Sequence, residues 1–189
     1  MRDPPLLCAP CPTPRCAALR SPYTPRMIER IISGGQTGVD RAALDAALET
    51  GFPCAGWAPR GRLAEDGPIP ERYPLKETPD DDVEQRTEWN VRDADGLLIL
   101  TLGPTDIGTD HAARCAESAA KPILFIDMER MSASDAADEI IEWSNWRGLS
   151  AINIAGPRES SSPGVYDKAL AVVRALLQRP ELKNGSENA

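Results

Sequence analysis

Short apolar runs alternate with longer segments in which apolar residues recur at helical spacing, from Met27 to about Leu177. The apolar runs predict strands at 28–33, 52–58, 96–102, 122–127 and 151–155. Helical spacing predicts helices at 41–50, 83–94, 109–120, 135–146 and 164–177. The continuous apolar run GLLILTL at 96–102 is typical of a central parallel strand that is covered on both faces.

Strands that alternate with helices predict a parallel sheet with helices on both faces. We therefore expect the α/β class, as a Rossmann-like three-layer sandwich with a mainly parallel central sheet. The ligand-binding domain is expected to span residues 27–178, followed by a flexible polar tail at 179–189. Residues 59–82 resist assignment, and so long a stretch rich in proline and glycine is usually functional when it is ordered.

The first 26 residues are rich in proline and differ in charge from the rest of the chain. Residues 1–26 are interpreted either as a disordered extension or as the result of an upstream start codon, with Met27 as the true beginning. The pair Cys8 and Cys11 has the spacing of half a zinc site, but no second pair completes it. Cys54 and Cys115 are interpreted as small buried apolar residues, the usual state of cysteine in a cytoplasmic protein.

The charge of the chain argues against nucleic acid as a partner. The formal net charge is −8, and four arginines against one aspartate give residues 1–26 a charge of +3, which leaves −11 for the remainder. So acidic a body disfavours electrostatic binding of DNA or RNA, although a local pocket still accepts a small anion. No apolar run has the length of a membrane span, and no secretory signal pattern is present. We therefore expect a cytoplasmic protein with no membrane partner.

In an open parallel sheet, ligands bind beyond the carboxyl ends of the strands. This rule selects three loops, at 34–40, 103–109 and 156–163. The first lies in SGGQTGVDRAALD, residues 33–45, which lacks the lysine of a nucleotide-triphosphate loop and is not a GxGxxG motif. Its three glycines, together with Gln36 and Thr37 at a helix start, favour an anion-binding loop over a plain tight turn. Asp40 is interpreted either as the N-cap of the following helix or as a ligand.

The other two loops also combine glycine with small polar residues. Gly108 and Thr109 stand at a second helix start, which favours another anion seat. The single histidine, His111, is interpreted as a surface or helix-cap residue rather than a catalytic one, because no partner can be named. In the third loop Arg158 is suited to a phosphate or oxyanion, the alternative being an exposed surface turn. Nearby donors in this loop are Asn153, Gly156, Ser160 and Ser161.

Five stretches in this order resemble one family. They are SGGQTGVDRAALD, PRGRLAEDGPIPERYPLKET, RTEWNVRDADGLLIL, the GT at 108–109, and NIAGPRES. The sequence is similar to the molybdenum-cofactor carrier proteins, a circularly permuted branch of the Rossmann-like superfamily that contains the Lonely Guy phosphoribohydrolases. The resemblance covers residues 28–178 and leaves out the N-terminal extension.

The resemblance implies a homo-oligomer, a homotetramer or homodimer, that binds and protects the molybdenum cofactor without chemical turnover. Molybdoenzymes are the implied recipients, and residues 59–82 are suited to act as a lid over a labile pterin phosphate. The glycines and amides suit the phosphate and the pterin edge, respectively. The expected cofactor-binding residues are Gly34, Gly35, Gln36, Thr37, Gly38, Arg60, Arg86, Thr87, Asn90, Gly108, Thr109, Asn153, Gly156, Arg158 and Ser160.

One position departs from the enzymatic relatives. Phosphoribohydrolases of the superfamily resemble Gly-Gly-x-Gly-Thr-x-x-Glu, and Ala112 stands here at the position of that catalytic glutamate. The protein is therefore expected not to be an enzyme. Two alternatives stay open: a nucleotide-processing N-glycosidic hydrolase, in which Glu65 or Asp66 substitutes, and a nucleotide-sensing module without catalysis. The sequence does not decide between pterin and purine as the ligand.

Overall fold

The computed structural model describes residues 27–183 of the 189-residue chain. The strands of the main sheet are β1 (Arg30–Ile32), β2 (Cys54–Ala58), β5 (Leu75–Glu77), β6 (Gly96–Thr101), β7 (Ile123–Asp127) and β8 (Ala151–Ala155). The helices are α1 (Val39–Thr50), α2 (Val83–Asp93), α3 (Ile107–Ser118), α4 (Ala133–Arg147), α5 (Val165–Leu177) and α6 (Pro180–Lys183). A separate hairpin consists of β3 (Leu63–Ala64) and β4 (Gly67–Pro68).

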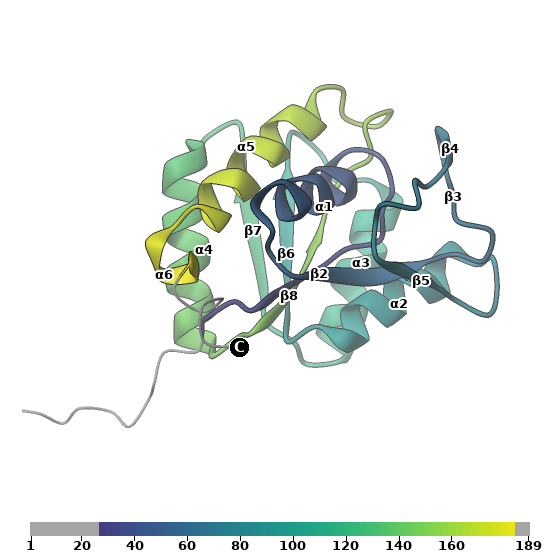
Figure 1. Ribbon diagram of the computed structural model, residues 1–189, viewed down its shortest axis with the longest axis horizontal. Coiled ribbons are helices and arrows are strands. Elements are labelled where there is room, and N and C mark those ends of the chain that lie inside the picture. Colours follow the sequence, from purple (N-terminus) through teal and green to yellow (C-terminus); the bar gives the residue numbers. More distant parts are fainter. Residues whose placement is uncertain (1–26, 184–189) are drawn as a thin grey trace, which may run out of the picture.

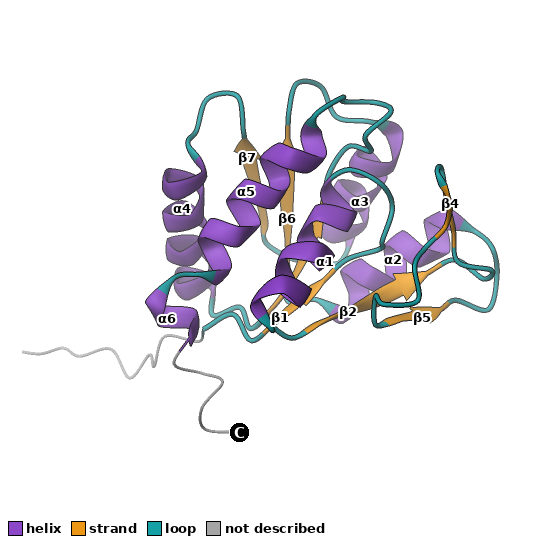
Figure 2. Cartoon of the chain, turned by 45° about the horizontal axis from the view of Figure 1, so that its top comes forward, coloured by secondary structure: helices purple, strands orange, loops and turns teal. Residues whose placement is uncertain are grey.

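The six-stranded sheet has the order β5-β2-β1-β8-β6-β7, and its five strand pairings are all parallel. Helices α1, α4 and α5 lie against one face, and α2 and α3 lie against the other (Figures 1 and 2). The predicted fold class, an α/β three-layer sandwich of Rossmann type, is confirmed. The chain places β2 and β5 on one side of β1, then forms β6 and β7 on the other side, and finally inserts β8 between β1 and β6. The direction in which strands are added to the sheet therefore reverses at β1, β8 and β6.

The main core lies between the sheet and helices α1, α4 and α5. Alanines at helical spacing let α1 lie close to the sheet and to α5, and Ala42, Ala43, Ala46 and Ala47 are all fully buried. A smaller cluster on the other face joins β6 to α2 and α3 through Leu97, Ile99, Val91, Ala112 and Ala116. Strand β6 is therefore covered on both faces, as its continuous apolar sequence predicts.

Helix ends follow the expected capping chemistry. Asp82, Asp106 and Ser132 are the N-caps of α2, α3 and α4, and each side chain accepts a hydrogen bond from a backbone amide of its first turn. Helix α1 ends at Gly51, which has a φ of 69° and lies in the left-handed region, as its sequence position predicts.

Residues 59–82 contain more structure than the sequence indicates. Besides the β3–β4 hairpin they include β5, which pairs in parallel with β2 and extends the sheet. Ile69 and Tyr73 are buried and pack with Leu44 of α1 in a cluster of their own. The segment is thus attached to the body at its base, while the hairpin projects from it toward the carboxyl ends of the strands (Figure 1).

The domain also reaches further than the predicted boundary at residue 178. Pro180–Lys183 forms α6, and Leu182 is 5% exposed and packs in the main core. The prediction of a flexible tail from residue 179 is therefore wrong for this helix. The remaining tail residues and the predicted extension at 1–26 lie outside the described residues. Within 27–183, no helix is long and apolar enough to cross a membrane.

Candidate functional site

A cleft lies at the carboxyl ends of β1, β8 and β6, where the strand order reverses and where ligands bind in open parallel sheets. Its cavity has a volume of about 50 Å³, room for only a few water molecules. Helices α2 and α3 form one wall. The cleft is lined by Gly34, Gln36, Asp40, Val83, Arg86, Thr87, Asn90, Asp106, Gly108, Thr109, Ala112, Asn153, Ala155, Gly156 and Arg158.

Most of the residues expected to bind the cofactor line this cleft, although they come from four separate stretches of sequence. Those that do are Gly34, Gln36, Arg86, Thr87, Asn90, Gly108, Thr109, Asn153, Gly156 and Arg158. Five expected residues are not part of its lining. Arg60 is exposed on the turn after β2, whereas Gly35, Thr37, Gly38 and Ser160 belong to the rim described below.

A buried ion pair lines the bottom of the cleft. Nη1 of Arg86 lies 3.0 Å from Oδ2 of Asp40, and the two side chains are only 11% and 8% exposed. Gly34 permits this pair, because a Cβ there would lie 1.8 Å from Nη1 of Arg86. Burial raises the pKa of Asp40, and this effect outweighs the opposing influence of Arg86 and of the Gln36 amide. The N-cap of α1 is Gly38, so the interpretation of Asp40 as the N-cap is wrong.

Two glycines of the first loop are required by backbone conformation and by close packing. Gly35 and Gly38 have φ values of 76° and 75°, in the left-handed region that favours glycine. A Cβ on Gly38 would lie 2.5 Å from the carbonyl oxygen of Pro157, so this glycine lets the first and third loops touch. A Cβ on Gly35 would meet the Leu75 side chain at 2.7 Å. The glycine pattern therefore has structural reasons in addition to any role in binding.

At the start of α3, a carboxylate of the protein itself accepts the hydrogen bond of a backbone amide. Oδ1 of Asp106 accepts hydrogen bonds from the amide and the hydroxyl of Thr109, each at 2.8 Å, and Oδ2 accepts one from the Arg158 amide at 3.2 Å. Burial opposes the charge of Asp106, but these hydrogen bonds outweigh it, so its pKa is lowered. The Thr109 amide, expected to face a ligand anion, is thus engaged by Asp106.

Two of the expected ligands on α2 also bond to the protein itself. The Asn90 side chain accepts from the Trp57 amide at 2.8 Å and donates to the Trp57 carbonyl at 3.1 Å, which ties α2 to β2. The Thr87 hydroxyl donates to the Val83 carbonyl of its own helix at 3.0 Å. Both residues line the cleft, but their main hydrogen bonds are structural.

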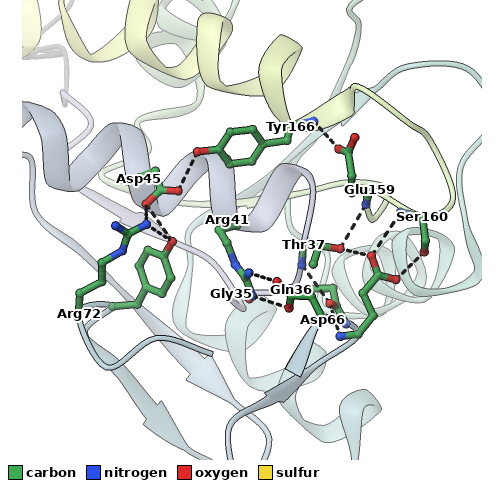
Figure 3. A network of polar contacts seen from close by, with 12 residues as sticks. Gly35, Gln36, Thr37, Arg41, Asp45, Asp66, Arg72, Glu159, Ser160 and Tyr166 are labelled. Carbon is green, nitrogen blue, oxygen red and sulfur yellow. Dashed lines mark hydrogen bonds and ion pairs between the residues drawn. The ribbon is translucent and has the colours of Figure 1, made fainter. Parts of the chain in front are cut away.

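Glu65, at the turn of the β3–β4 hairpin, bridges the first and third loops. Figure 3 shows the residues that it joins, Thr37 of the first loop and Ser160 of the third. The Glu65 carboxylate accepts hydrogen bonds from the Thr37 hydroxyl, from the Ser160 hydroxyl at 2.5 Å and from the Ser160 amide at 3.3 Å. Nη1 of Arg158 lies 3.9 Å from the same carboxylate. Partial burial opposes the charge, but the hydrogen bonds from Ser160 and Thr37 outweigh it, so the pKa of Glu65 is lowered. The donors of Thr37, Ser160 and Arg158, called the seat below, thus hold a carboxylate of the protein itself.

Two further contacts tie the hairpin to the first loop. The Gln36 side-chain oxygen accepts from the amides of Thr37 and Glu65, each at 3.0 Å. Nη1 of Arg41 lies 2.5 Å from Oδ2 of Asp66, and Nη2 of Arg41 also donates to the Gly35 carbonyl at 3.2 Å. All of these contacts are polar and none is deeply buried, so the tip of the hairpin is the weakly held end of residues 59–82.

The base of the same segment is held by a buried carboxylate. Asp45 of α1 accepts hydrogen bonds from Arg72 at 2.7 Å, from the Tyr73 hydroxyl at 2.8 Å and from the Tyr166 hydroxyl at 2.9 Å (Figure 3). Burial, reinforced by the neighbouring Asp45 carboxylate, raises the pKa of Tyr166 to about 12. This network joins α1, α5 and the segment before β5, and so provides a fixed base from which the hairpin extends.

Helix α3 places Ala112 in the wall of the cleft and His111 outside its lining. Ala112 is 2% exposed and contributes only a methyl group to the cleft. His111 is half-buried in a separate groove, where its Nε2 lies 3.4 Å from Sγ of Cys115. Cys115 and Cys54 are both half-buried, so the interpretation of buried cysteines is wrong for both residues. Cys115 is in polar contact with His111, whereas Cys54 packs against apolar residues.

Sequence reasoning missed Asp106 as a member of the site and did not find the partners of Asp40 and Glu65. A signal existed for Asp106, because aspartate is a preferred N-cap and stands three residues before Thr109 at a predicted helix start. No signal existed for the pair of Asp40 with Arg86, since 46 residues separate them.

The glycine loop before α1 and Arg158 of the third loop both lie in sequence stretches on which the family resemblance rests. The sequence profile of the circularly permutated YpsA SLOG family matches residues 31–177. The chain belongs to this family. A solved structure of a "putative molybdenum carrier protein" from Syntrophus aciditrophicus SB is similar over 79% of this chain and 95% of that chain, with 45% sequence identity and a TM-score of 0.76. No curated protein matches the chain.

Proposed function

We propose that this member of the circularly permutated YpsA SLOG family binds the molybdenum cofactor as cargo and carries it without chemical turnover. The name of the Syntrophus protein, a molybdenum carrier, supports this choice of ligand over a purine nucleotide. The cargo would reach recipient molybdoenzymes in the cytoplasm, and the carrier would act as a homotetramer or homodimer.

The observation that carries the proposal is the chemistry of the cleft and its rim. Arg158 stands at the mouth, 36% exposed, and the seat of Thr37 and Ser160 beside it already holds a carboxylate. A terminal phosphate offers the same kind of oxygen to these donors. Ala112 leaves a methyl group where a hydrolase needs an acid. The site is thus equipped to hold an anion and has Ala112 at the position expected for the catalytic glutamate of the phosphoribohydrolases.

The size of the cleft requires it to open. Sites for ligands of this size measure roughly 300–1,000 Å³, whereas the cavity here holds about 50 Å³. The hairpin tip is attached to the first and third loops by exposed polar contacts, through Glu65 and Asp66. In this account the cargo's phosphate displaces Glu65 from its seat, and the hairpin closes again over the bound cofactor as a lid.

Binding is tested directly by anaerobic equilibrium dialysis against molybdenum cofactor released from a purified molybdoenzyme, with molybdenum and pterin measured on both sides. The proposal predicts retention of both in equal amounts by the wild type. Arg158→Ala should retain less, and Arg130→Ala, which changes an exposed arginine outside the cleft, should retain as much as the wild type. Retention of neither component by the wild type would contradict the proposal.

A hydrolase acting on nucleotides is a second candidate, because the cleft contains the carboxyl group of Asp40. Asp40 is buried there and its pKa is raised. Its ion pair with Arg86 argues for a structural role instead. Incubation with nucleoside monophosphates, followed by chromatography of the free base, separates the two functions. Release of base at about 1 per second or faster, abolished by Asp40→Asn, would replace the carrier by an enzyme.

A further inference from the structure

Outside the cleft, three side chains of different chemistry converge between α2 and α3. Glu88 of α2 and His111 and Cys115 of α3 each offer one ligand atom, and these three atoms all lie within 4.8 Å of one another. His111 and Cys115 are one helical turn apart, so their side chains lie on the same face of α3. All three residues line a groove of about 560 Å³, separate from the cleft.

We propose that Glu88, His111 and Cys115 form a binding site for a divalent transition metal ion of the zinc type. A thiolate, an imidazole and a carboxylate are the ligands that zinc takes in proteins. In a tetrahedral site, bonds of about 2.3 Å to sulfur and 2.0–2.1 Å to nitrogen place these two ligand atoms about 3.6 Å apart. Sγ of Cys115 and Nε2 of His111 already lie 3.4 Å apart, so both reach one ion without movement of the helix.

The residues around His111 and Cys115 indicate the third protein ligand and what could take the fourth position of the ion. Glu88 is exposed, so its carboxylate is free to rotate onto an ion held by the other two groups. Three protein ligands leave the fourth position of a tetrahedral ion for water or for a ligand in the groove. The groove is also lined by Arg92, Arg114 and Lys121. Their positive charge favours a small anion as the fourth ligand of the metal ion.

Metal binding at this site exchanges one proton for the ion. Burial raises the pKa of Cys115, and the carboxylates of Glu88 and Glu84 on α2 add to this, while Arg114 on α3 opposes it. The metal-free residue is therefore a thiol, in contact with His111. The ion forms a bond to sulfur as the S–H bond breaks and the proton leaves to solvent, so no oxidant or reductant is needed.

The proposal is independent of the cargo in the cleft, and its test uses the metal alone. The full chain is prepared with Cys8, Cys11 and Cys16 changed to serine, so that N-terminal thiols do not bind the probe. Titration with Co²⁺ should give visible absorption typical of tetrahedral cobalt together with a thiolate charge-transfer band in the near ultraviolet, and Zn²⁺ should abolish both.

Matched variants decide the outcome. Cys115→Ala should lose the charge-transfer band and bind Co²⁺ at least tenfold more weakly, and His111→Ala should also bind at least tenfold more weakly. Cys54→Ala, which removes the other described cysteine, should behave as the parent does. Melting of each variant in the presence of a chelator checks that it folds. No uptake of Co²⁺ by the folded parent, or uptake unchanged in Cys115→Ala, would overturn the proposal.

Discussion

Removing the Glu65 carboxylate should make the anion seat easier to occupy. In the structure this carboxylate takes hydrogen bonds from Thr37 and Ser160 and faces Arg158, so a ligand anion competes with it for the same donors. Glu65→Ala leaves these donors in place and takes away the competitor. The expected result is tighter binding of an oxyanion, which is the opposite of what loss of an ordinary ligand contact produces.

The size of the effect follows from the exposure of the contacts. Hydrogen bonds to a charged group contribute about 1.5–3 kcal/mol when buried, and exposed ion pairs contribute about 0.2–1 kcal/mol. The Glu65 side chain is 22% exposed, so the strength of its contacts should lie between these two ranges. Displacing it should therefore cost about 1.4 kcal/mol, and its removal should lower the dissociation constant for the anion about tenfold.

Isothermal titration of the variant with inorganic phosphate measures this directly. Asp66→Ala is the matched control, because it also frees the hairpin tip but removes a carboxylate that pairs with Arg41 outside the seat. Glu65→Ala should gain about tenfold in affinity, and Asp66→Ala should gain much less. If Glu65→Ala binds phosphate no better than the wild type, Glu65 does not occupy an anion site and the reasoning fails.

The same contact should depend on pH in a defined direction. Because the pKa of Glu65 in the folded protein lies below its ordinary value of 4.5, its stabilising contribution is present above that value. The contribution is lost as the pH falls through the lowered pKa. The difference in melting temperature between wild type and Glu65→Ala should therefore be constant near neutral pH and shrink on acidification below about 4.5. A difference that grows on acidification would contradict this assignment.

The remaining predictions concern the cleft and the base of the hairpin. Gly34→Ala should break the pair of Arg86 with Asp40 and lower the free energy of unfolding by about 3 kcal/mol in chemical denaturation, whereas an unchanged midpoint would show that Arg86 moves aside freely. Arg158→Ala should weaken phosphate binding by about 1.5–3 kcal/mol, and equal affinity would remove Arg158 from the site. Asp45→Ala should destabilise the fold by about 3 kcal/mol, because it removes three hydrogen bonds at a buried position, and a loss below about 1 kcal/mol would mean that water replaces them.

Much of the fold was predictable because its strands and helices carry their own periodicity. The apolar run at β6 and the alanine-rich pattern of α1 indicate burial without knowledge of the partner. Strands β3 and β4 are only two residues long and β5 contains a single apolar residue, so no apolar run indicates any of them. Their positions depend on contacts with distant residues, such as the packing of Tyr73 and Ile69 on α1. The sequence alone therefore does not assign residues 59–82 to strands or helices.

The location of the cleft was predictable for a different reason. The rule for parallel sheets points to loops that follow strands, and glycine with small polar residues marks the loops after β1, β6 and β8. The structure brings these loops together. Which groups face one another inside the cleft does not follow from that rule. The pairing of Arg86 with Asp40, and that of Glu65 with Ser160, join residues far apart in sequence. Their roles in binding stay predictions.

The central claim, that the protein carries the molybdenum cofactor, is tested most directly by what the native protein holds when it is purified. The full chain is produced in a host that makes the cofactor and isolated without oxygen. Its small molecules are then identified by mass spectrometry and its molybdenum is quantified. The account predicts a pterin phosphate and molybdenum in equal amounts, both reduced in Arg158→Ala. A stoichiometric nucleotide with no pterin and no molybdenum would contradict it.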